Sequence, residues 1–364
     1  MKFRCERDVL VEALTVVGRA VSSRGGSLPV LTGVHAQLQG DSLQLLGTDL
    51  ELSISIGLTV AGQEDGVAVI PARLFSDVVR SLEPGAVTVT VVEDSAQIVA
   101  GRSQFSLRLI PADEFPRAKE PTEQAIELPG KLFAQALRQV VPAASSDDSR
   151  PILTGVLLAA EGDGIRLVAT DSYRLAVRDI PGTAVLQEGQ KVLLPSRALG
   201  ELARLLGNAE TVTLRLGERD ASFELGGTRL TTRLIEGEFP NYRGLIPASH
   251  PNRLTVGREV MLDALRRVRL LARESTPVRL QMRHDGLDLV AMTQDVGQAQ
   301  EAIDATYEGD ELTIAFNPEY LSDGLDVTTG DEVTLESLDA RNPAILRPAG
   351  ATDFLYLLMP VRVS

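Results

Sequence analysis

Residues that commonly carry out catalysis or bind metals are few and scattered in this 364-residue chain. The three histidines, His35, His250 and His284, have no second histidine or cysteine at the spacing of metal ligands, and the single Cys5 excludes a cage of cysteines. Nucleophile-elbow, P-loop and dinucleotide-binding motifs are absent from the sequence. No acid, base and nucleophile assemble in recognisable roles. We therefore expect no catalytic residues, no metal and no cofactor, and we interpret His35, which falls in an apparent strand, as structural.

Arginines form the second group that could do chemistry, since all but four of the 36 basic residues are arginines. A guanidinium group can bind phosphate through two parallel hydrogen bonds. Several arginines recur at equivalent places, on predicted helices or in the loops before two Leu-Thr-Gly segments. Each one alone is explained more simply as a solvated residue with an acidic neighbour, but their recurrence favours a surface that contacts nucleic-acid phosphates without reading bases. The candidates are Arg24, Arg73, Arg150, Arg197, Arg266 and Arg269.

The acidic character of the chain is regional. Its formal net charge is −14, yet residues 284–340 alone hold 15 acids and no Lys or Arg, so the remainder is nearly balanced and can present a positive face. No run of 18 apolar residues occurs, and Glu6, Asp8 and Glu12 interrupt the place of a signal-peptide core. With one cysteine, the sequence predicts a protein of the reducing cytoplasm that has no membrane partner.

Three repeats of about 121 residues account for the whole chain. Residues 29–34 (Pro-Val-Leu-Thr-Gly-Val) match residues 151–156 (Pro-Ile-Leu-Thr-Gly-Val), and residues 163–169 match residues 285–291, both at an offset of 122. One short match could arise by chance, but several colinear matches at a near-constant offset indicate duplicated domains. The predicted domains are residues 1–123, 124–248 and 249–364.

Each repeat shows the same order of predicted elements. A short strand and an amphipathic helix come first, with apolar residues at helical spacing from Val9 onward in the first repeat. Alternating strands follow, such as residues 42–46. A second helix begins after Pro71, Pro195 and Asn317, residue types suited to a helix start, and further strands complete the repeat. The sequence therefore predicts the α+β class: three repeated domains, each with two helices packed on antiparallel sheets.

A set of motifs extends from the first residue nearly to the last. They are residues 1–3 (Met-Lys-Phe), 47–51 (Gly-Thr-Asp-Leu-Glu), 71–73 (Pro-Ala-Arg), 101–107 (Gly-Arg-Ser-Gln-Phe-Ser-Leu), 169–176 (Ala-Thr-Asp-Ser-Tyr-Arg-Leu-Ala), 237–243 (Gly-Glu-Phe-Pro-Asn-Tyr-Arg) and 359–362 (Met-Pro-Val-Arg). No one motif suffices, but together they are specific. Through them the whole chain resembles the bacterial DNA polymerase III β subunit family, the β sliding clamps.

The resemblance implies repeated DNA-clamp domains and a homodimeric ring of six domains, whose helices line a hole for double-stranded DNA without sequence specificity. It implies a processivity factor that is not an enzyme. The implied partners are the replicative DNA polymerase, the clamp loader, other proteins with a clamp-binding motif and a second copy of the chain. The matches for the dimer interface are Phe105, Leu107, Leu270 and Leu271.

The resemblance also implies one pocket per chain for a short peptide, between the second and third domains. Such peptides usually contain a glutamine and paired apolar residues. Ser172 stands where glycine is common in the family, Tyr173 where histidine or tyrosine is found, and Ala344 where serine is often found. Carried over position by position, the pocket consists of Leu153, Thr170, Ser172, Tyr173, Arg174, Leu175, Pro240, Leu245, Ala344, Leu357 and Met359.

Two other functions stay open from the residues alone. One is an enzyme built from repeated α+β domains, which the lack of a catalytic constellation disfavours. The other is a repeat scaffold that binds peptides but not DNA. Retention on circular compared with linear DNA separates this scaffold from a sliding clamp.

Overall fold

The computed structural model describes residues 1–22, 28–116, 122–183, 186–248, 250–272, 276–294 and 296–362. The chain folds into two compact units. Unit 1 contains Met1–Lys131 and Glu201–Leu234, and unit 2 contains Leu132–Gly200 and Ile235–Ser364. The second repeat therefore contributes to both units.

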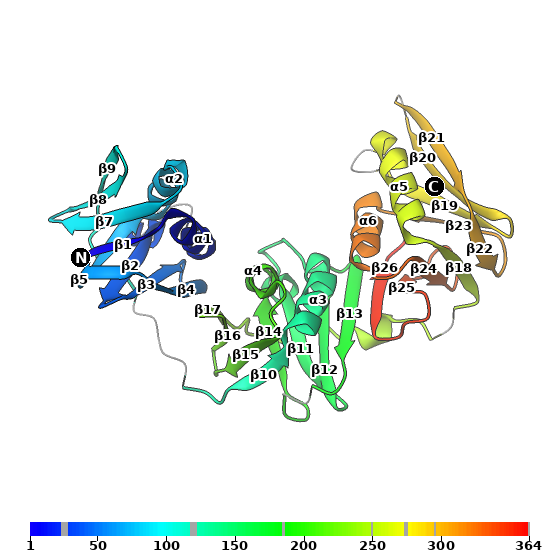
Figure 1. The fold of residues 1–364 in the computed structure, drawn as a ribbon. Coiled ribbons are helices and arrows are strands. Elements are labelled where there is room, and N and C mark those ends of the chain that lie inside the picture. The colour runs from blue at the N-terminus through cyan, green and yellow to red at the C-terminus, as the bar shows by residue number, and fades with distance from the viewer. Residues whose placement is uncertain are drawn as a thin grey trace. The chain divides into compact units, whose positions relative to one another are not determined.

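Each repeat has the predicted order of strand, helix, strands, helix and strands (Figure 1). The first contains β1 (Lys2–Glu6), α1 (Arg7–Gly18), the 3-10 helix η1 (Pro29–Thr32), β2 (Gly33–Gln39), β3 (Ser42–Thr48), β4 (Leu52–Thr59), β5 (Ala61–Glu64), β6 (Gly66–Pro71), α2 (Ala72–Ser81), β7 (Ala86–Val92), β8 (Ser95–Ala100) and β9 (Ser103–Arg108). The second contains β10 (Ile126–Pro129), α3 (Gly130–Val140), η2 (Val141–Ala143), η3 (Pro151–Thr154), β11 (Gly155–Glu161), β12 (Gly164–Thr170), β13 (Arg174–Ile180), β14 (Lys191–Pro195), α4 (Ser196–Leu206), β15 (Thr211–Leu216), β16 (Asp220–Leu225), β17 (Thr228–Arg233) and η4 (Arg243–Leu245). The third contains β18 (Asn252–Gly257), α5 (Arg258–Val268), η5 (Arg269–Leu271), β19 (Val278–Arg283), β20 (Gly286–Thr293), β21 (Gly297–Ile303), β22 (Ala305–Glu308), β23 (Leu312–Phe316), α6 (Pro318–Val327), β24 (Glu332–Ser337), β25 (Ala344–Pro348) and β26 (Phe354–Leu358).

The second helix of each repeat begins where the sequence predicts. α2 begins directly after Pro71, α4 after Pro195 and α6 after Asn317. The Asn317 side-chain oxygen accepts hydrogen bonds from the backbone N–H groups of Glu319 at 2.8 Å and Tyr320 at 3.4 Å. This cap satisfies two donors that have no partner inside the helix.

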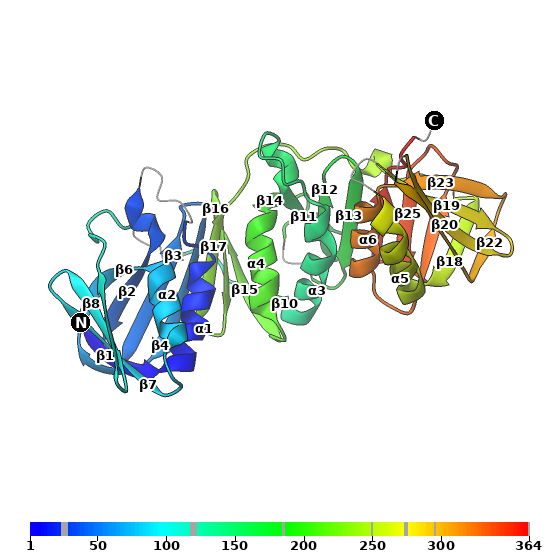
Figure 2. The ribbon, with the colours of Figure 1, turned by 90° about the horizontal axis from the view of Figure 1, so that it is seen from above.

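The helices lie on the sheets as pairs within the first and third repeats (Figure 2). α1 contacts α2, β3 and β4, while α5 contacts α6, β20 and β21. The apolar positions of each helix recur on one stripe, which is the buried one. In α1 the buried residues are Leu10, Ala13, Leu14 and Val17, and in α5 they are Met261, Leu262, Ala264, Leu265 and Val268.

Antiparallel sheets run across the junctions between repeats. Unit 1 has a five-stranded sheet in the order β5-β1-β7-β8-β9 and an eight-stranded sheet in the order β10-β15-β16-β17-β4-β3-β2-β6. Unit 2 has a nine-stranded sheet in the order β14-β11-β12-β13-β26-β25-β24-β18-β22 and a four-stranded sheet in the order β21-β20-β19-β23. The β17–β4 pair joins the second repeat to the first, and the β13–β26 pair joins it to the third.

Features that would suggest a membrane, a metal or a reactive thiol are not found in the described residues. No helix there is long and apolar enough to cross a membrane. No group of three or more His, Cys, Asp or Glu side chains in those residues could hold a metal ion. Burial, helped by the neighbouring Glu6, raises the pKa of the Cys5 thiol to about 11, so the less reactive protonated form dominates at neutral pH.

Candidate functional site

Leu175 and Leu357 lie at the centre of an apolar cluster in unit 2. They face each other across the β13–β26 pair, and only 1% and 2% of their surfaces are exposed. Because side chains two apart on a strand share a face, Val177 and Leu355 extend this face. The other buried members are Leu157, Ala159, Val168, Leu193 and Tyr242, with Ile152, Ile235, Phe239 and Ile246 packed against them.

Sequence reasoning identified Leu175 and Leu357 but missed Val177 and Leu355. The alternation of apolar residues along β13 and β26 was the signal that could have found them. The cluster also contains aromatic residues from the 239–242 segment, which no strand or helix pattern marks. The residues that pack against the cluster are sequence neighbours of three predicted ones. They are Ile152 beside Leu153, Phe239 beside Pro240 and Ile246 beside Leu245. Leu153 itself is buried, whereas Pro240 and Leu245 are exposed.

The tight loop between β12 and β13 carries Ser172 and Tyr173, two residues predicted for the peptide site. The Asp171 carboxylate accepts the backbone N–H of Tyr173 at 2.8 Å, and the Thr170 hydroxyl accepts that of Ser172 at 3.1 Å. Ser172 has a positive φ of 83°, the left-handed region that favours glycine, as does Leu50 at the equivalent place in the first repeat. The side-chain hydrogen bonds hold the turn without a glycine. Ser172 and Tyr173 are both exposed on this turn.

Arg174 is held by residues of its own chain. Its Nε lies 3.0 Å from Asp171 Oδ2, and its Nη1 pairs with Asp323 and donates to the Tyr356 hydroxyl at 3.3 Å. The guanidinium also lies 4.4 Å from the centre of the Tyr320 ring. Burial disfavours its charge, but these acidic and phenolic neighbours keep the pKa of Arg174 above its usual value. Arg174 therefore braces the β13–β26 junction, with few donors left for a ligand.

Exposed apolar residues lie at the end of β26. Met359 follows this strand with 39% of its surface exposed, and its N–H donates to the Tyr173 carbonyl oxygen at 2.9 Å. Tyr173 is 58% exposed, and its ring stacks near that of Tyr320 with centroids 6.3 Å apart. Ala344 lies opposite Leu358 on the β25–β26 pair and is fully buried. The structure thus gives a buried apolar floor, a loop with hydrogen-bonding groups and an adaptable methionine in one region of unit 2.

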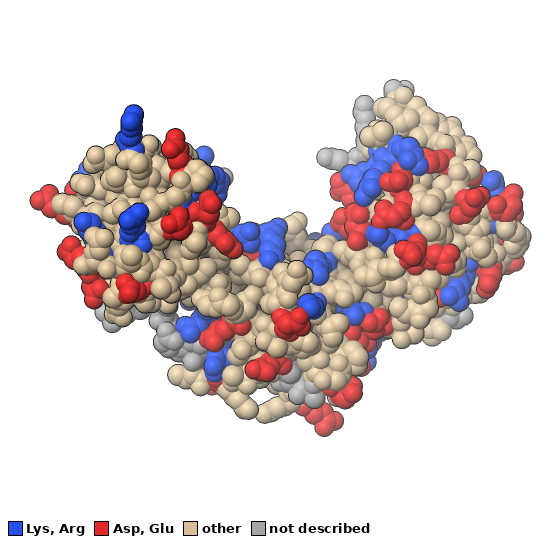
Figure 3. Space-filling view, viewed as in Figure 1, with Lys and Arg blue, Asp and Glu red and all other residues tan. Residues whose placement is uncertain are grey.

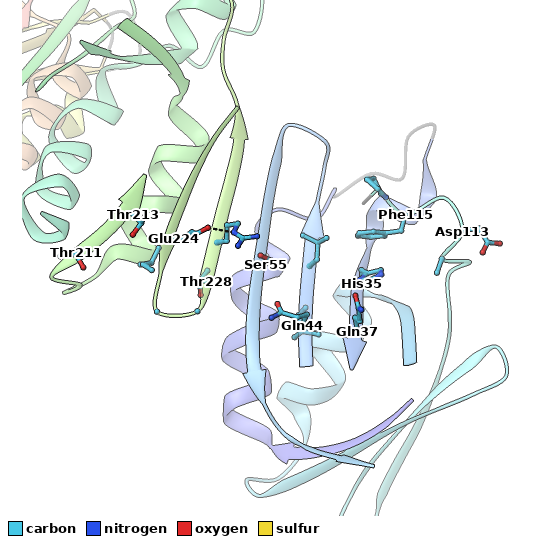
Figure 4. A pocket seen from close by; sticks show the side chains of 18 residues that line it. His35, Gln37, Gln44, Ser55, Asp113, Phe115, Thr211, Thr213, Glu224 and Thr228 are labelled. Carbon is cyan, nitrogen blue, oxygen red and sulfur yellow. Dashed lines mark hydrogen bonds and ion pairs between the residues drawn. The ribbon is translucent and has the colours of Figure 1, made fainter. Parts of the chain in front are cut away.

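The junction of the first and second repeats has the same strand arrangement but different side chains. β4 pairs with β17 as β13 pairs with β26, and Ser53 and Thr231 occupy the places of Leu175 and Leu357. A cavity of about 1100 Å³ opens on this face of the eight-stranded sheet (Figure 4). Most of its lining side chains are polar: Gln37, Gln44, Ser55, Asp113, Thr211, Thr213, Glu224, Thr228 and Arg229. The facing pair is therefore apolar at the junction of the second and third repeats and polar at that of the first and second.

His35 lines the same cavity. Its ring centroid lies 4.9 Å from that of Phe115, and burial lowers the pKa of His35 below its usual value. The imidazole is therefore neutral at physiological pH and packs as an aromatic ring. This arrangement agrees with a structural histidine.

Comparisons with known proteins identify the family. Models of the DNA polymerase III beta subunit match the chain in succession: the N-terminal domain over residues 1–119, the central domain over residues 127–241 and the C-terminal domain over residues 243–362. The chain belongs to the DNA polymerase III β subunit family. A beta sliding clamp of Streptomyces coelicolor is 36% identical, and the alignment covers both chains completely.

Solved structures of family members agree in fold. The DNA polymerase sliding clamp from Bacillus subtilis has a TM-score of 0.91 at 31% identity, with both chains fully covered. A sliding clamp from Bartonella birtlesii, bound to griselimycin, has a TM-score of 0.92 at 32% identity, also with full coverage. The prediction of three clamp domains is thereby confirmed. The function of the family is that of a non-catalytic processivity factor for DNA polymerase III, and it is the function of this chain.

The arginines predicted to contact DNA in this clamp subunit lie mainly on or beside helices. Arg73 on α2 is almost fully exposed, with its Nε 3.9 Å from Asp77 Oδ2, and Arg197 is exposed at the start of α4. Arg150 precedes η3, with its Nε 3.1 Å from Asp147 Oδ2. Arg24 lies outside the described residues. Arg73, Arg150 and Arg197 keep at least part of their surface open to solvent.

The third repeat also carries a group of basic residues. Lys and Arg side chains gather over α5 in the space-filling view (Figure 3). Arg266 lies on α5, 3.1 Å from Asp263 and 3.6 Å from Asp326. Arg269 follows in η5, is exposed and has no ion pair within the described part of the chain. Among the described residues, acids therefore pair with Arg266 on α5 but not with Arg269 in η5.

The residues predicted for the dimer interface lie at sheet edges. Phe105 and Leu107 share one face of β9, the last strand of the five-stranded sheet, and neither is buried. Leu270 in η5 is 82% exposed, and the neighbouring Leu271 is partly exposed. η5 contacts β21, the edge strand of the four-stranded sheet. In the described residues, apolar side chains therefore lie on the edge strand β9 and beside the edge strand β21.

Proposed function

We propose that two copies of this chain close into a ring of six domains around duplex DNA, and that each copy holds partner peptides over the β13–β26 junction. The partners are the replicative polymerase, the clamp loader and other proteins that carry the same short motif. The observation that carries this proposal is the apolar floor at Leu175 and Leu357, bordered by the exposed Met359 and Tyr173. The ring encircles chromosomal DNA, so the protein works in the bacterial cytoplasm.

The peptide region has the composition expected of a site for short linear motifs. Such sites are largely apolar and contain a few polar groups that fix the orientation of the ligand. Here the partly buried Phe239 and Ile246 extend the apolar floor, and the hydroxyl of Ser172 and the open face of Tyr173 lie at its border. Met359 has an unbranched side chain that can adapt to different partners.

The helix arginines support contacts to DNA that are weak and independent of sequence. Each contact to a phosphate adds affinity without reading a base. The acids beside Arg73 and Arg266 reduce the attraction, which suits a protein that must move along the duplex. Topological linkage, rather than affinity, then keeps the ring on DNA.

The seam between copies is supported by the two exposed edges. Pairing β9 of one copy with β21 of the other would satisfy both rows of unpaired backbone groups and cover Phe105, Leu107, Leu270 and Leu271. An uncovered apolar edge strand is otherwise prone to aggregation. Two such seams related by a two-fold axis close the ring with the same contacts used twice.

Solution mass and small-angle scattering test the ring. We expect a mass of twice the 39.1 kDa of one chain and a distance distribution with the dip of a hollow particle. A monomer, or a solid dimer without a central hole, would contradict the proposal. Retention on circular DNA distinguishes the proposed ring from a peptide-binding scaffold that does not bind DNA.

The domain limits 1–123, 124–248 and 249–364 stay a prediction.

A further inference from the structure

A second charged region lies in the third repeat, beside the proposed peptide site. Three arginines, Arg279, Arg341 and Arg362, border a cavity of about 680 Å³, which we call the arginine cavity. Arg279 belongs to β19, Arg341 to the loop between β24 and β25, and Arg362 to the segment after β26. These positions are far apart in the sequence, so only the fold brings the three side chains to one cavity.

Hydrogen bonds order each of the three segments that border the arginine cavity. Arg279 lies opposite Ala315 on the β19–β23 pair. The N–H of Val361 donates to the Ala315 carbonyl oxygen at 2.8 Å, so the C-terminal segment lies beside β23. The loop of Arg341 is closed by Asp339, whose carboxylate accepts the Arg341 N–H at 2.7 Å. The strand pairing and the Val361–Ala315 bond therefore fix the segments of Arg279 and Arg362 side by side, and Asp339 fixes the turn that carries Arg341.

The three guanidinium groups have no ion pair among the described residues, although 15 acids lie between residues 284 and 340. Arg283, on the same strand as Arg279, shows the contrast: its Nη2 lies 2.7 Å from Asp288 Oδ2. Asp339 uses its oxygens for the N–H groups of its own loop. These hydrogen bonds, and after them the charge of Arg341, lower the pKa of Asp339. Three like charges around one cavity repel one another until an anion joins them.

We propose that the arginine cavity binds acidic side chains that flank the apolar motif of a partner peptide, an inference that rests on the proposed function. The same chain segment borders both sites, because Met359 bonds to Tyr173 and Val361 bonds to Ala315. Arg362 is three residues from Met359, which is at most about 10 Å of extended chain. A peptide whose acidic residues lie three or four positions from its apolar anchors can therefore reach both sites.

The position of Arg279 on its sheet favours carboxylates of a partner over phosphates of the duplex. On β19, Arg279 alternates with Val278 and Leu280, which are fully buried. Arg279 therefore lies on the face opposite the apolar side, the side on which α5 packs against β20 and β21. In the proposed ring the helices face DNA, so the arginine cavity faces away from the hole. Paired guanidinium and carboxylate groups form strong, geometrically specific hydrogen bonds.

Calorimetric titration of the full chain with three peptides tests the proposal. All three carry the same glutamine-containing apolar motif with three residues added on each side. In the first peptide the three residues before the motif are glutamates, in the second the three residues after it are glutamates, and all other added residues are glutamines. The third, neutral peptide has glutamines at all six added positions. We expect one acidic peptide to bind about fivefold more tightly than the neutral peptide at low salt, and this advantage to shrink at high salt. Equal affinities for all three peptides would overturn the proposal.

Matched variants separate the arginine cavity from the pocket. Arg279→Gln and Arg341→Gln should each reduce the advantage of the acidic peptide and leave the affinity for the neutral peptide unchanged. Arg283→Gln, on the same strand but ion-paired, is the control and should keep the advantage. An advantage that survives in the folded double variant Arg279→Gln, Arg341→Gln would also overturn the proposal.

Inorganic phosphate distinguishes a small-anion site from a peptide site. Phosphate should compete with the acidic flank and leave the neutral peptide unaffected. If phosphate binds but no acidic peptide gains affinity, the cavity holds small anions only and the proposal fails. If no peptide binds the wild-type protein, the peptide pocket itself is wrong, and this inference falls with it.

Discussion

Leu175 of the second repeat lies directly opposite Leu357 of the third across the β13–β26 strand pair. At the matching junction of the first and second repeats, the facing residues are Ser53 and Thr231. Leu175 and Leu357 are themselves almost fully buried, so the area that a peptide can remove from water lies on the exposed apolar residues beside them, such as Met359, at about 25 cal/mol for each Å². At the other junction, hydroxyl groups covered without a partner oppose binding. The two junctions of one chain therefore offer different surfaces to the same ligand.

We expect one apolar-motif peptide to bind per chain. The Leu175–Leu357 junction should accept it and the Ser53–Thr231 junction should not. Calorimetric titration gives the stoichiometry directly. Two equivalent peptides per chain would show that the polar junction also binds the motif.

Changing Met359 to Asp should weaken peptide binding by roughly 100-fold or more, because the complex would bury an unpaired carboxylate. Val67→Asp is a matched control, since Val67 is also an exposed apolar residue but lies on β6 in the other unit. Calorimetry with a polymerase-derived peptide measures both variants. A folded Met359→Asp variant with wild-type affinity would show that Met359 is not part of the site.

Changing Leu270 and Leu271 together to Ala should convert the dimer to a monomer. Each apolar side chain buried in the seam contributes up to roughly 1.5–3 kcal/mol, and both changes act at two seams. Leu74→Ala on α2, which is also exposed, should leave the dimer intact. Sedimentation velocity measures the result, and an unchanged dimer of the double variant would contradict the seam.

Changing Arg73 and Arg269 to Ala should weaken DNA binding about equally on every sequence. Each lost phosphate contact should flatten the slope of log affinity against log salt by about 0.9. Arg253→Ala is the control, because Arg253 lies on a strand, with its Nε 4.0 Å from Glu336 Oε1. Fluorescence anisotropy at several salt concentrations gives the slopes. A variant that loses affinity for one base sequence only would contradict contacts to phosphate alone.

Local features of this fold follow from the sequence because they depend on neighbouring residues. The starts of α2, α4 and α6 follow from a proline or an asparagine that suits the first turn of a helix. The repeat offset of 122 aligns the strands of successive domains without a structure. The family resemblance assigns Leu175 and Leu357 to one peptide site, and in the structure they face each other across the β13–β26 pair.

Other features depend on residues that are distant in the chain, and no periodicity in the sequence predicts them. The contact of Arg174 with Asp323, 149 residues later, is one of them. The convergence of Arg279, Arg341 and Arg362 depends on how β19, β23 and the C-terminal segment lie together. Pairings of this kind are set by packing and sheet order, which a single sequence does not reveal.

Topological linkage to DNA is the central claim, and retention on circular DNA tests it most directly. The protein is loaded onto a nicked circular plasmid by the clamp loader with ATP, separated from free protein by gel filtration, and the plasmid is then cut once. At a salt concentration that removes phosphate contacts, we expect the protein to elute with the circle and to leave the DNA after the cut. Protein that leaves the intact circle, or that stays on the linear product, would contradict a ring that encircles DNA.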